Sequence, residues 1–321
     1  MLLLMQFKHC HPLLLHLTQS KSRLTFSLYG KYFIYGPPDI FILLFLITTL
    51  MQALKNINAL IIDMDGVLWE GLDPLPGLIP FFDTLRKNNT SFILATNNAS
   101  LTQQQYIAKL KKMGVTVSAD EVLTSSMATA QYLSELTTPK TTRLFVIGEE
   151  GLRQPLVDKG FILTDSQSFI ESEPADYVVC GLDRQLSWKK LATASLHLNA
   201  GAQFIATNAD TTLPTEQGPV VGNGAILAAL ETASQKAPTV IGKPGATMYQ
   251  HAMSILNATP EQTVAIGDRL NTDILGAVNT GIRSIMVLTG ISSREDLKTI
   301  DYQPTWIMED IQEITRALQI D

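Results

Sequence analysis

Short apolar runs alternate with longer stretches of helical periodicity from Asn58 onward. The runs have the length and β-branched content of buried strands, and the periodic stretches between them predict helices. The strands expected on this basis comprise residues 59–62, 92–95, 264–266 and 284–288. This alternation is typical of an α/β protein with a mainly parallel sheet, and that is the fold class we predict.

Local signals support two of the helices. Thr102 begins a capping-box pattern, which predicts a helix from there to about Met113. Asn271 or Thr272 is expected to cap a second helix that ends near Gly281.

A second α/β pattern interrupts the first between residues 97 and 242, a separation far longer than one crossover connection requires. Its strand-like runs are 144–147, 177–179 and 204–206, and its helical stretches are 188–199 and 223–233. We therefore predict three parts, namely an atypical leader at 1–54, a core domain made of 55–137 and 237–321, and an inserted α/β domain at 138–236.

The first 54 residues differ in composition from the rest of the chain. They carry four basic side chains and one acid, and they contain an apolar run at residues 40–50. This run is shorter than the roughly 20 residues that a membrane-spanning helix needs, so no stable membrane association is expected. Our preferred hypothesis is that the native chain begins at Met51. The alternative is that residues 1–50 form a targeting segment or a membrane anchor.

The overall composition indicates which partners the protein can bind and in which compartment it is expected. The 321 residues are 45% apolar and 17% charged, which is enough for a sizeable core, and the net charge is −6. This negative charge argues against a nucleic acid polymer as a partner. Because the whole chain has only two cysteines, Cys10 and Cys180, we expect no disulfide framework and predict a cytoplasmic protein.

Polar clusters follow the predicted strands at their carboxyl ends. Open parallel sheets place their ligands at these ends, so we expect the clusters to converge on one crevice. A further short run at residues 239–241 leads into a cluster in the same way. The four clusters are Asp63-Met64-Asp65, Thr96-Asn97-Asn98, Gly242-Lys243-Pro244 and Gly267-Asp268-Arg269.

Asp63 and Asp65 can divide the work of a phosphoryl-transfer reaction. Residues two apart on an extended segment face the same way, and Gly66 lets the chain turn directly after them. Asp63 is then placed to attack phosphorus, while Asp65 can protonate the leaving oxygen and later activate water. The alternative for this motif alone is that one Asp caps a turn and the other is solvated.

Two carboxylates repel the dianionic group of a phosphomonoester unless a cation intervenes. Mg²⁺ is the expected cation, because it is commonly held by one or two carboxylates together with substrate oxygens. Asp268 supplies a third carboxylate at a strand end. Asp273, one helical turn later, is expected either to support the metal or Lys243, or to interact only with the helix dipole.

The phosphoryl group also needs positive charge and hydrogen-bond donors, since phosphoryl transfer is catalysed mainly by positioning and electrostatics. Lys243 is the candidate cation, because it lies between a strand and a helix that we expect to begin at a proline. Thr96, Asn97 and the backbone N–H groups of that turn are the candidate donors.

Four other residues are expected to serve packing. His197 lies in a helical pattern and is predicted to be a packed or surface histidine. Cys180 ends an apolar strand and is predicted to be a small buried hydrophobe. Trp69 and Trp188 are each expected to pack in the core or to line the entrance of the cleft.

Taken in order along the chain, the four clusters resemble the four motifs of the haloacid dehalogenase superfamily. More narrowly, they are similar to its NagD-like, p-nitrophenyl phosphatase branch (subfamily IIA), and the similarity covers about residues 57–310. The resemblance implies a Rossmann-like, doubly wound core with an inserted C2-type cap domain. Two segments of the inserted domain also resemble sequences of this branch, namely residues 181–188 and 204–210.

The resemblance also implies a role for each motif residue. Asp63 is the nucleophile and Asp65 the acid and base, Thr96 and Asn97 hold the phosphate, and Lys243 neutralises its charge. The implied Mg²⁺ ligands are Asp63, the Asp65 carbonyl and Asp268.

We therefore predict Mg²⁺-dependent hydrolysis of small phosphomonoesters through an aspartyl-phosphate on Asp63. The resemblance suggests nucleotides, sugar phosphates, phosphoglycolate or pyridoxal phosphate as substrates. It is also compatible with a homo-oligomer such as a dimer. A phosphomutase or phosphotransferase of the same superfamily and a non-catalytic phosphate-binding protein are the alternatives. In the inserted domain, the candidates for reading the leaving group of the substrate are Asp183, Arg184, Asn208 and Asp210.

Overall fold

The computed structural model describes residues 57–164, 173–213 and 217–319, together with the backbone of three short strands nearer the N-terminus. These strands form an antiparallel sheet in the unit made by residues 1–56, and residues 57–319 form a separate compact unit. The three strands are β1 (Thr18–Ser20), β2 (Arg23–Ser27) and β3 (Phe33–Ile34). The apolar run at 40–50 and the hypothetical start at Met51 lie outside the described residues. Within the described part of the chain, no helix has the length and apolar character to cross a membrane.

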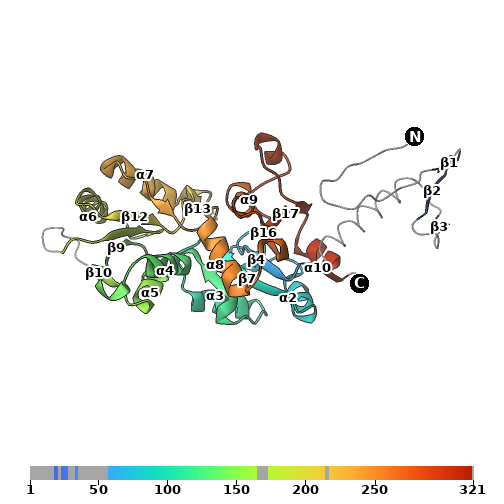
Figure 1. Ribbon diagram of the computed structural model, residues 1–321, viewed down its shortest axis with the longest axis horizontal. Coiled ribbons are helices and arrows are strands. Elements are labelled where there is room, and N and C mark those ends of the chain that lie inside the picture. The colour runs from blue at the N-terminus through green and yellow to red at the C-terminus, as the bar shows by residue number, and fades with distance from the viewer. Residues whose placement is uncertain are drawn as a thin grey trace. The chain divides into compact units, whose positions relative to one another are not determined.

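A six-stranded parallel sheet organises one half of the larger unit (Figure 1). The chain enters it in the middle at β4, continues to β7 and β8 on one side, and then adds β16, β17 and β18 on the other side. The strand order therefore reverses between β4 and β16, which is where open α/β sheets hold their ligands. In spatial order the strands are β18 (Trp306–Met308), β17 (Arg283–Val287), β16 (Thr263–Gly267), β4 (Ala59–Ile62), β7 (Ser91–Thr96) and β8 (Val122–Thr124).

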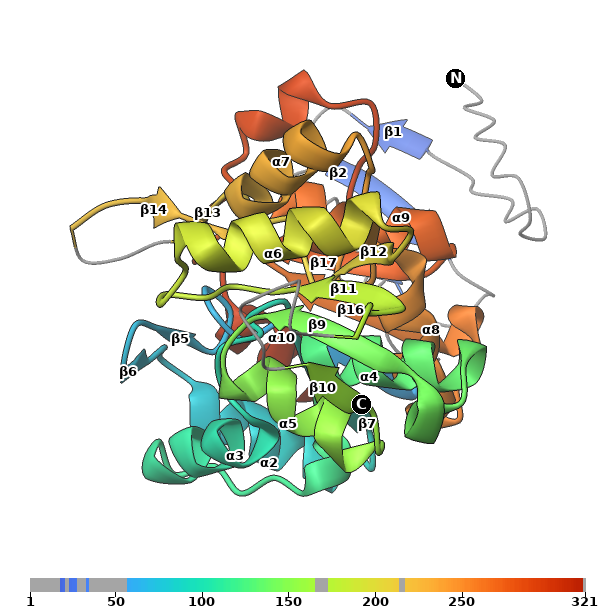
Figure 2. The same ribbon diagram turned by 90° about the vertical axis from the view of Figure 1, so that its left-hand side faces the viewer.

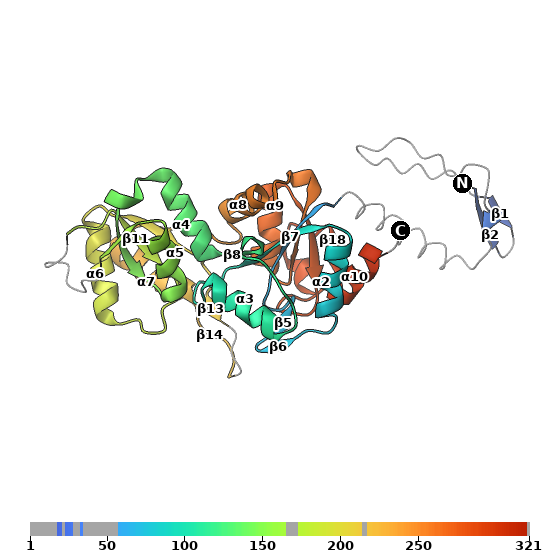
Figure 3. The ribbon, with the colours of Figure 1, turned by 90° about the horizontal axis from the view of Figure 1, so that it is seen from below.

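Side chains alternate along the strands of this first sheet, so both of its faces carry apolar side chains, and helices cover both. Ile61 and Ile93 pack on one face with residues of α8 (Ala246–Leu256) and α9 (Leu275–Thr280). On the other face, the ring of Phe92 meets Phe82 of α2 (Leu78–Lys87) edge-on, with the ring centroids 5.2 Å apart. Figure 3 shows α8 and α9 on one side of the sheet, with α2 and α10 (Ile311–Gln319) on the other.

A five-stranded parallel sheet organises the other half of the same unit. Phe145 and Ile147 pack on one face with α6 (Trp188–Asn199) and α7 (Asn223–Ser234). Leu144 and Val146 pack on the other face with α4 (Ser125–Leu136) and α5 (Glu150–Asp158), an arrangement visible in Figure 2. In spatial order the strands are β10 (Ile162–Thr164), β9 (Arg143–Ile147), β11 (Tyr177–Cys180), β12 (Gln203–Ala206) and β15 (Thr239–Val240).

Shorter elements connect the two sheets and their helices. The remaining helix is α3 (Gln103–Lys112). Two antiparallel hairpins pair β5 (Trp69–Glu70) with β6 (Asp73–Pro74), and β13 (Thr212–Leu213) with β14 (Val220–Val221). The short helical turns are η1 (Ala119–Glu121), η2 (Pro139–Thr141), η3 (Pro260–Gln262), η4 (Leu270–Ile274) and η5 (Asp296–Thr299).

The predicted fold class is confirmed, because both large sheets are parallel and flanked by helices. The capping box at Thr102 is present, since its side chain accepts from the backbone of Gln105 and the Gln105 side chain accepts from the backbone of Thr102. His197, Cys180 and Trp69 are all fully buried, as expected of packing residues, but Trp188 is 82% exposed and does not pack in the core.

Three local predictions are wrong. The strand expected at 239–241 is β15, and it pairs with β12 in the second sheet instead of joining the first. The helix expected to begin at a proline is α8, which begins at Ala246 after Gly245. Neither Asn271 nor Thr272 caps α9, because the π-helical turn η4 precedes that helix and the Asp273 carboxylate accepts from the N–H of Arg269 at 3.1 Å.

Candidate active site

The two central strands of the first sheet each end in an aspartate. Asp63 follows β4 and Asp268 follows β16. The backbone N–H of Asp63 donates to the carbonyl of Ile266 at 2.8 Å, which joins the two strand ends. Both carboxylates therefore lie at the reversal of strand order, the position where open α/β sheets hold their ligands.

Lys243 reaches this end of the first sheet from the segment that follows β15. Its ammonium group is buried and donates to Asp63 Oδ1 at 2.5 Å, to Asp273 Oδ1 at 2.7 Å and to the carbonyl of Ala95 at 2.9 Å. An ammonium group has three N–H bonds, so these contacts use all of them. Lys243 is thus held as a fixed positive charge between Asp63 and Asp273.

Three carboxylates share one small volume with this single cation. Asp63, Asp268 and Asp273 each offer an oxygen within 4.8 Å of the others. Both oxygens of Asp273 already accept hydrogen bonds, one from Lys243 and one from the N–H of Arg269. The carboxylates with capacity left for a metal are therefore Asp63 and Asp268, and Asp273 acts as the partner that holds Lys243.

Asp268 carries the observation that best fits a bound cation. Its Oδ2 accepts from the N–H of Ile291 at 2.7 Å, but its Oδ1 is buried and has no hydrogen-bond partner among the described residues. A buried charged oxygen without a partner is costly unless a cation binds it. Gly66 and Gly290 leave the space around this carboxylate, since a Cβ at Gly66 would lie 2.7 Å from Asp268 Oδ2 and one at Gly290 would overlap it.

The pKa values of the cluster show the same excess of negative charge. Burial raises the pKa of Asp63 well above its ordinary range, Lys243 opposes that rise, and Asp273 and Asp268 add to it. Burial, and then Asp273, raise the pKa of Asp268 to about 6. Burial by itself would lower the pKa of Lys243, but Asp273 and Asp63 more than offset this, and the pKa lies above its ordinary value. Lys243 therefore stays charged.

Asp65 lies beside this cluster and has a different environment. Its carboxylate is on the exposed side of the strand end, and its Oδ1 accepts a hydrogen bond from the indole Nε1–H of Trp69 at 2.7 Å. One carboxylate is therefore held by a buried lysine, and the other, more exposed carboxylate is held by a buried indole.

Thr96 and Asn97 end the neighbouring strand β7 and are both engaged by the protein. Thr96 Oγ1 accepts from the N–H of Asn98 at 3.0 Å. Asn97 Oδ1 accepts from the N–H of Lys243, and its Nδ2 donates to the carbonyl of Lys243 and to Asp210 Oδ2. The Asn97 side chain therefore fixes the Lys243 segment to the end of β7.

Asp210 connects the second sheet to the strand-end clusters of the first. It lies beyond β12, and its Oδ2 accepts from Asn97 at 3.0 Å and from Asn208 at 2.5 Å. Its Oδ1 lies 3.5 Å from Nη1 of Arg269, the residue after Asp268. Asn208 and Asp210, predicted to read the leaving group, are thus placed where they join the two halves of the unit.

Replacing Asp210 with Asn is expected to lower kcat/KM about tenfold, because hydrogen bonds to a charged group are each worth about 1.5–3 kcal/mol and the catalytic atoms themselves are unchanged. Steady-state kinetics check this result. Glu309→Gln is the matched control, since Glu309 pairs with Arg294 at 2.8 Å on an exposed surface where such pairs contribute little. Equal kinetics for Asp210→Asn and Glu309→Gln would contradict the prediction.

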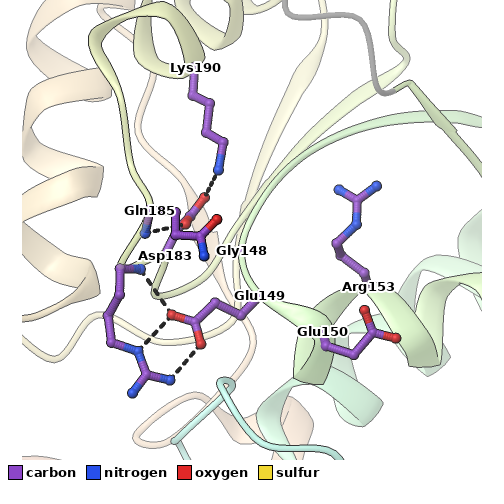
Figure 4. Close-up of a pocket in the computed structure, with 8 residues that line it drawn as sticks. Gly148, Glu149, Glu150, Arg153, Asp183, Gln185 and Lys190 are labelled. Carbon is purple, nitrogen blue, oxygen red and sulfur yellow. Dashed lines mark hydrogen bonds and ion pairs between the residues drawn. The ribbon is translucent and has the colours of Figure 1, made fainter.

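Asp183 and Arg184, the other two candidates, line a cavity of about 550 Å³ in the second half of the unit (Figure 4). The Arg184 guanidinium donates twice to the Glu149 carboxylate, at 2.8 and 2.5 Å. Lys190 donates to the buried Asp183 at 2.7 Å. The cavity lies at the carboxyl ends of β9 and β11, where the strand order of the second sheet also reverses.

Sequence reasoning missed Glu149, Lys190 and the contact of Trp69. Glu149 follows a predicted strand, so the strand-end rule that identified Asp63 also applies to it. Lys190 lies one turn into a correctly predicted helix, and nothing in the local pattern distinguishes it from a solvated lysine. Trp69 was assigned to packing, and its spacing of four residues from Asp65 across Gly66 was the available signal for the hydrogen bond.

Comparison with known proteins agrees with this geometry. A haloacid dehalogenase-like hydrolase model matches residues 60–162, and a second HAD hydrolase-like model matches residues 240–314. The acid sugar phosphatase of Staphylococcus saprophyticus is 35% identical over 266 residues, which cover 83% of this chain and 100% of that protein.

Two solved structures are similar over the same region. NagD of E. coli is 31% identical with a TM-score of 0.72, and the match covers 83% of this chain and 98% of that one. The glycerol phosphate phosphatase of Mycobacterium tuberculosis, solved in complex with magnesium, is 34% identical with a TM-score of 0.74, covering 84% of this chain and 78% of that one. The chain therefore belongs to the haloacid dehalogenase-like hydrolases, and within them to the NagD-like phosphatases.

Proposed function

We propose that this chain is a Mg²⁺-dependent phosphatase that hydrolyses small phosphomonoesters through an aspartyl-phosphate on Asp63. The observation that carries the proposal is the pairing of Asp63 with Lys243 at 2.5 Å beside a buried Asp268 oxygen that has no partner among the described residues. A nucleophile, a fixed cation and a carboxylate able to bind a metal are the parts that phosphoryl transfer through an aspartate requires.

In the first step, an Asp63 oxygen attacks phosphorus while the bond from phosphorus to the leaving oxygen breaks. Asp65 gives its proton to that oxygen, and the product alcohol leaves. Lys243 lies against Asp63 and balances charge on the transferred group. Thr96 and the backbone of Asn97 hold the phosphoryl oxygens at the end of β7.

In the second step, Asp65 takes a proton from water, and the resulting hydroxide attacks the phosphorus of the aspartyl-phosphate. The bond from Asp63 to phosphorus breaks, inorganic phosphate leaves, and both aspartates return to their starting states. Asp63, the Asp65 carbonyl and Asp268 would hold Mg²⁺, which when bound neutralises phosphoryl charge and orients the group.

We also propose that residues 138–236 act as a cap that selects a polyhydroxylated leaving group. The 550 Å³ cavity is lined by three acids and three bases, with no aromatic ring among its lining residues. Such side chains donate to and accept from the hydroxyls of a sugar or glycerol phosphate. Gly151 of α5, the residue after the lining residue Glu150, packs on the backbone of residues 99–101 in the segment that follows Thr96 and Asn97.

Phosphate release from a panel of sugar phosphates, glycerol phosphate, nucleotides and pyridoxal phosphate tests the proposal. With Mg²⁺ we expect release from the sugar and glycerol phosphates, loss of release after chelation, and recovery when Mg²⁺ is restored. Release should need no sugar bisphosphate, which separates hydrolysis from a mutase reaction. Full activity after exhaustive chelation would rule out the metal-dependent mechanism.

A further inference from the structure

Trp69 is a buried side chain with one polar atom, and that atom contacts the acid and base proposed for the reaction. The indole is fully buried, and its Nε1–H donates to Asp65 Oδ1 at 2.7 Å. Indole has only this one donor, so its hydrogen bond to Asp65 leaves no unsatisfied polar atom in the core.

The backbone between the two residues is folded to make this contact. The N–H of Gly66 donates to the carbonyl of Trp69 at 2.8 Å, and the N–H of Leu68 donates to the carbonyl of Met64 at 2.8 Å. Gly66 has a φ of 82°, a left-handed conformation that glycine adopts without strain. The chain therefore turns back on itself directly after Asp65 and returns the indole to its carboxylate.

Lys109 of α3 lies over the face of the indole ring. Its ammonium nitrogen lies 4.1 Å from the centroid of the Trp69 ring and donates to the carbonyl of Gly71 at 2.9 Å. The first contact is a cation–π interaction, and the second fixes the turn between β5 and β6. The indole ring is thus fixed by a helix that does not take part in the strand-end clusters.

We propose that Trp69 is a positioning residue for Asp65, and this inference rests on the acid and base role proposed for Asp65. The hydrogen bond to Oδ1 fixes the carboxyl group at the mouth of the site, so that Oδ2 is presented to the leaving oxygen. Without the indole N–H, the exposed carboxyl group rotates among several rotamers and spends less time in the reactive one.

The consequence is a dependence on the leaving group that a purely structural role does not produce. When the bond from phosphorus breaks, its electron pair passes to the leaving oxygen. An alcohol such as glycerol needs the proton of Asp65 at that moment, whereas 4-nitrophenolate is stable as an anion and leaves without it. Poor positioning of Asp65 therefore slows alkyl phosphates selectively.

The test compares kcat/KM of Trp69→Phe and wild type for glycerol phosphate and for 4-nitrophenyl phosphate, because kcat/KM reports steps up to release of the alcohol. General acid catalysis contributes about 10²–10⁴-fold, so we expect roughly a 10- to 100-fold loss for glycerol phosphate and less than about threefold for 4-nitrophenyl phosphate. Trp306→Phe, the same change on edge strand β18, should alter neither. Equal loss on both substrates, or no loss, overturns the inference.

A double-mutant cycle separates this inference from the function on which it rests. Asp65→Asn should show the same selective loss, and adding Trp69→Phe to it should cause no further selective loss. If Asp65→Asn is itself unselective, the proposed role of Asp65 fails. If Asp65→Asn is selective but Trp69→Phe adds its full loss to it, only the positioning role of Trp69 fails.

The indole signals of the folded protein provide a measurement that does not depend on the stability of Trp69→Phe. In ¹H–¹⁵N spectra, Asp65→Asn should shift the Trp69 indole N–H resonance more than those of Trp188 and Trp306, since the variant replaces a charged acceptor. An unchanged chemical shift of the Trp69 indole N–H would show that the hydrogen bond is absent in solution and would contradict the inference.

Discussion

Asp63→Asn is expected to lower the rate of phosphate release by about 10⁴-fold or more, because an amide of the same shape has no anionic oxygen with which to attack phosphorus. Asp63 follows β4 and is held by Lys243, so its carboxylate has one orientation in the site. Phosphate release at saturating substrate measures the effect. Denaturation with radiolabelled substrate present should also trap a phosphorylated wild-type chain and no phosphorylated variant.

The matched control for this substitution is Asp83→Asn, the same chemical change at an exposed position of α2. It should leave the rate unchanged. Thermal unfolding of Asp63→Asn should confirm that the variant is folded, because Asn fills the same volume. A folded Asp63→Asn variant with wild-type turnover would remove the covalent mechanism and revive a phosphate-binding role without catalysis.

Lys243→Met is expected to reduce activity at least about hundredfold, since a preorganised charge at the transferred group is lost. It should also destabilise the metal-free protein by about 3–5 kcal/mol near pH 8, because removing one partner of a buried ion pair leaves the others uncompensated. The lysine contacts both Asp63 and Asp273, and Asp268 lies in the same cluster. Denaturant unfolding with chelator present measures the loss.

The loss of stability in Lys243→Met should depend on pH. The folded-state pKa values of Asp63 and Asp268 lie above their ordinary values, so ionising these groups costs stability as the pH rises through them, and the pKa of Asp268 is about 6. Lys243 offsets this cost in the wild type. The difference between variant and wild type should therefore be small near pH 5 and largest near pH 8.

A second substitution makes this prediction specific. Adding Asp273→Asn to Lys243→Met removes one of the three acids that the lysine faced, so it should restore part of the stability but none of the activity. Asp301→Asn, a change at an exposed position, should restore neither. If Lys243→Met is equally unstable at both pH values, the carboxylate cluster is not the source of the effect.

Much of this fold could be predicted from local pattern. The strands expected at 59–62 and 144–147 are present as β4 and β9, and the helix expected at 188–199 is α6. These predictions were right because a strand buried on both faces has a short continuous apolar run, whereas a helix buried on one face has apolar residues at helical spacing. The edge strands β8 and β18 were missed, since three residues are too few to establish a period.

Other features depend on contacts between residues far apart in the chain, and local pattern does not encode them. The run at 239–241 has the same apolar character whichever sheet it joins, and only its pairing with β12 assigns it to the second. The sequence predicts that Asn97 donates hydrogen bonds to the phosphate, but its side chain is hydrogen-bonded to Lys243 and Asp210 instead. The cytoplasmic location, the oligomeric state and the native start at Met51 stay predictions.

The sequence by itself determined the paired aspartates at residues 63 and 65, because a buried strand followed by polar residues predicts a strand end and strand ends carry the ligands of a parallel sheet. It did not determine what holds those aspartates. Lys243 and Trp69 contact them through distances that only the folded chain makes short, 2.5 and 2.7 Å. Local composition sets which residues lie at strand ends, whereas tertiary packing decides the charge and the hydrogen bond that each of them meets.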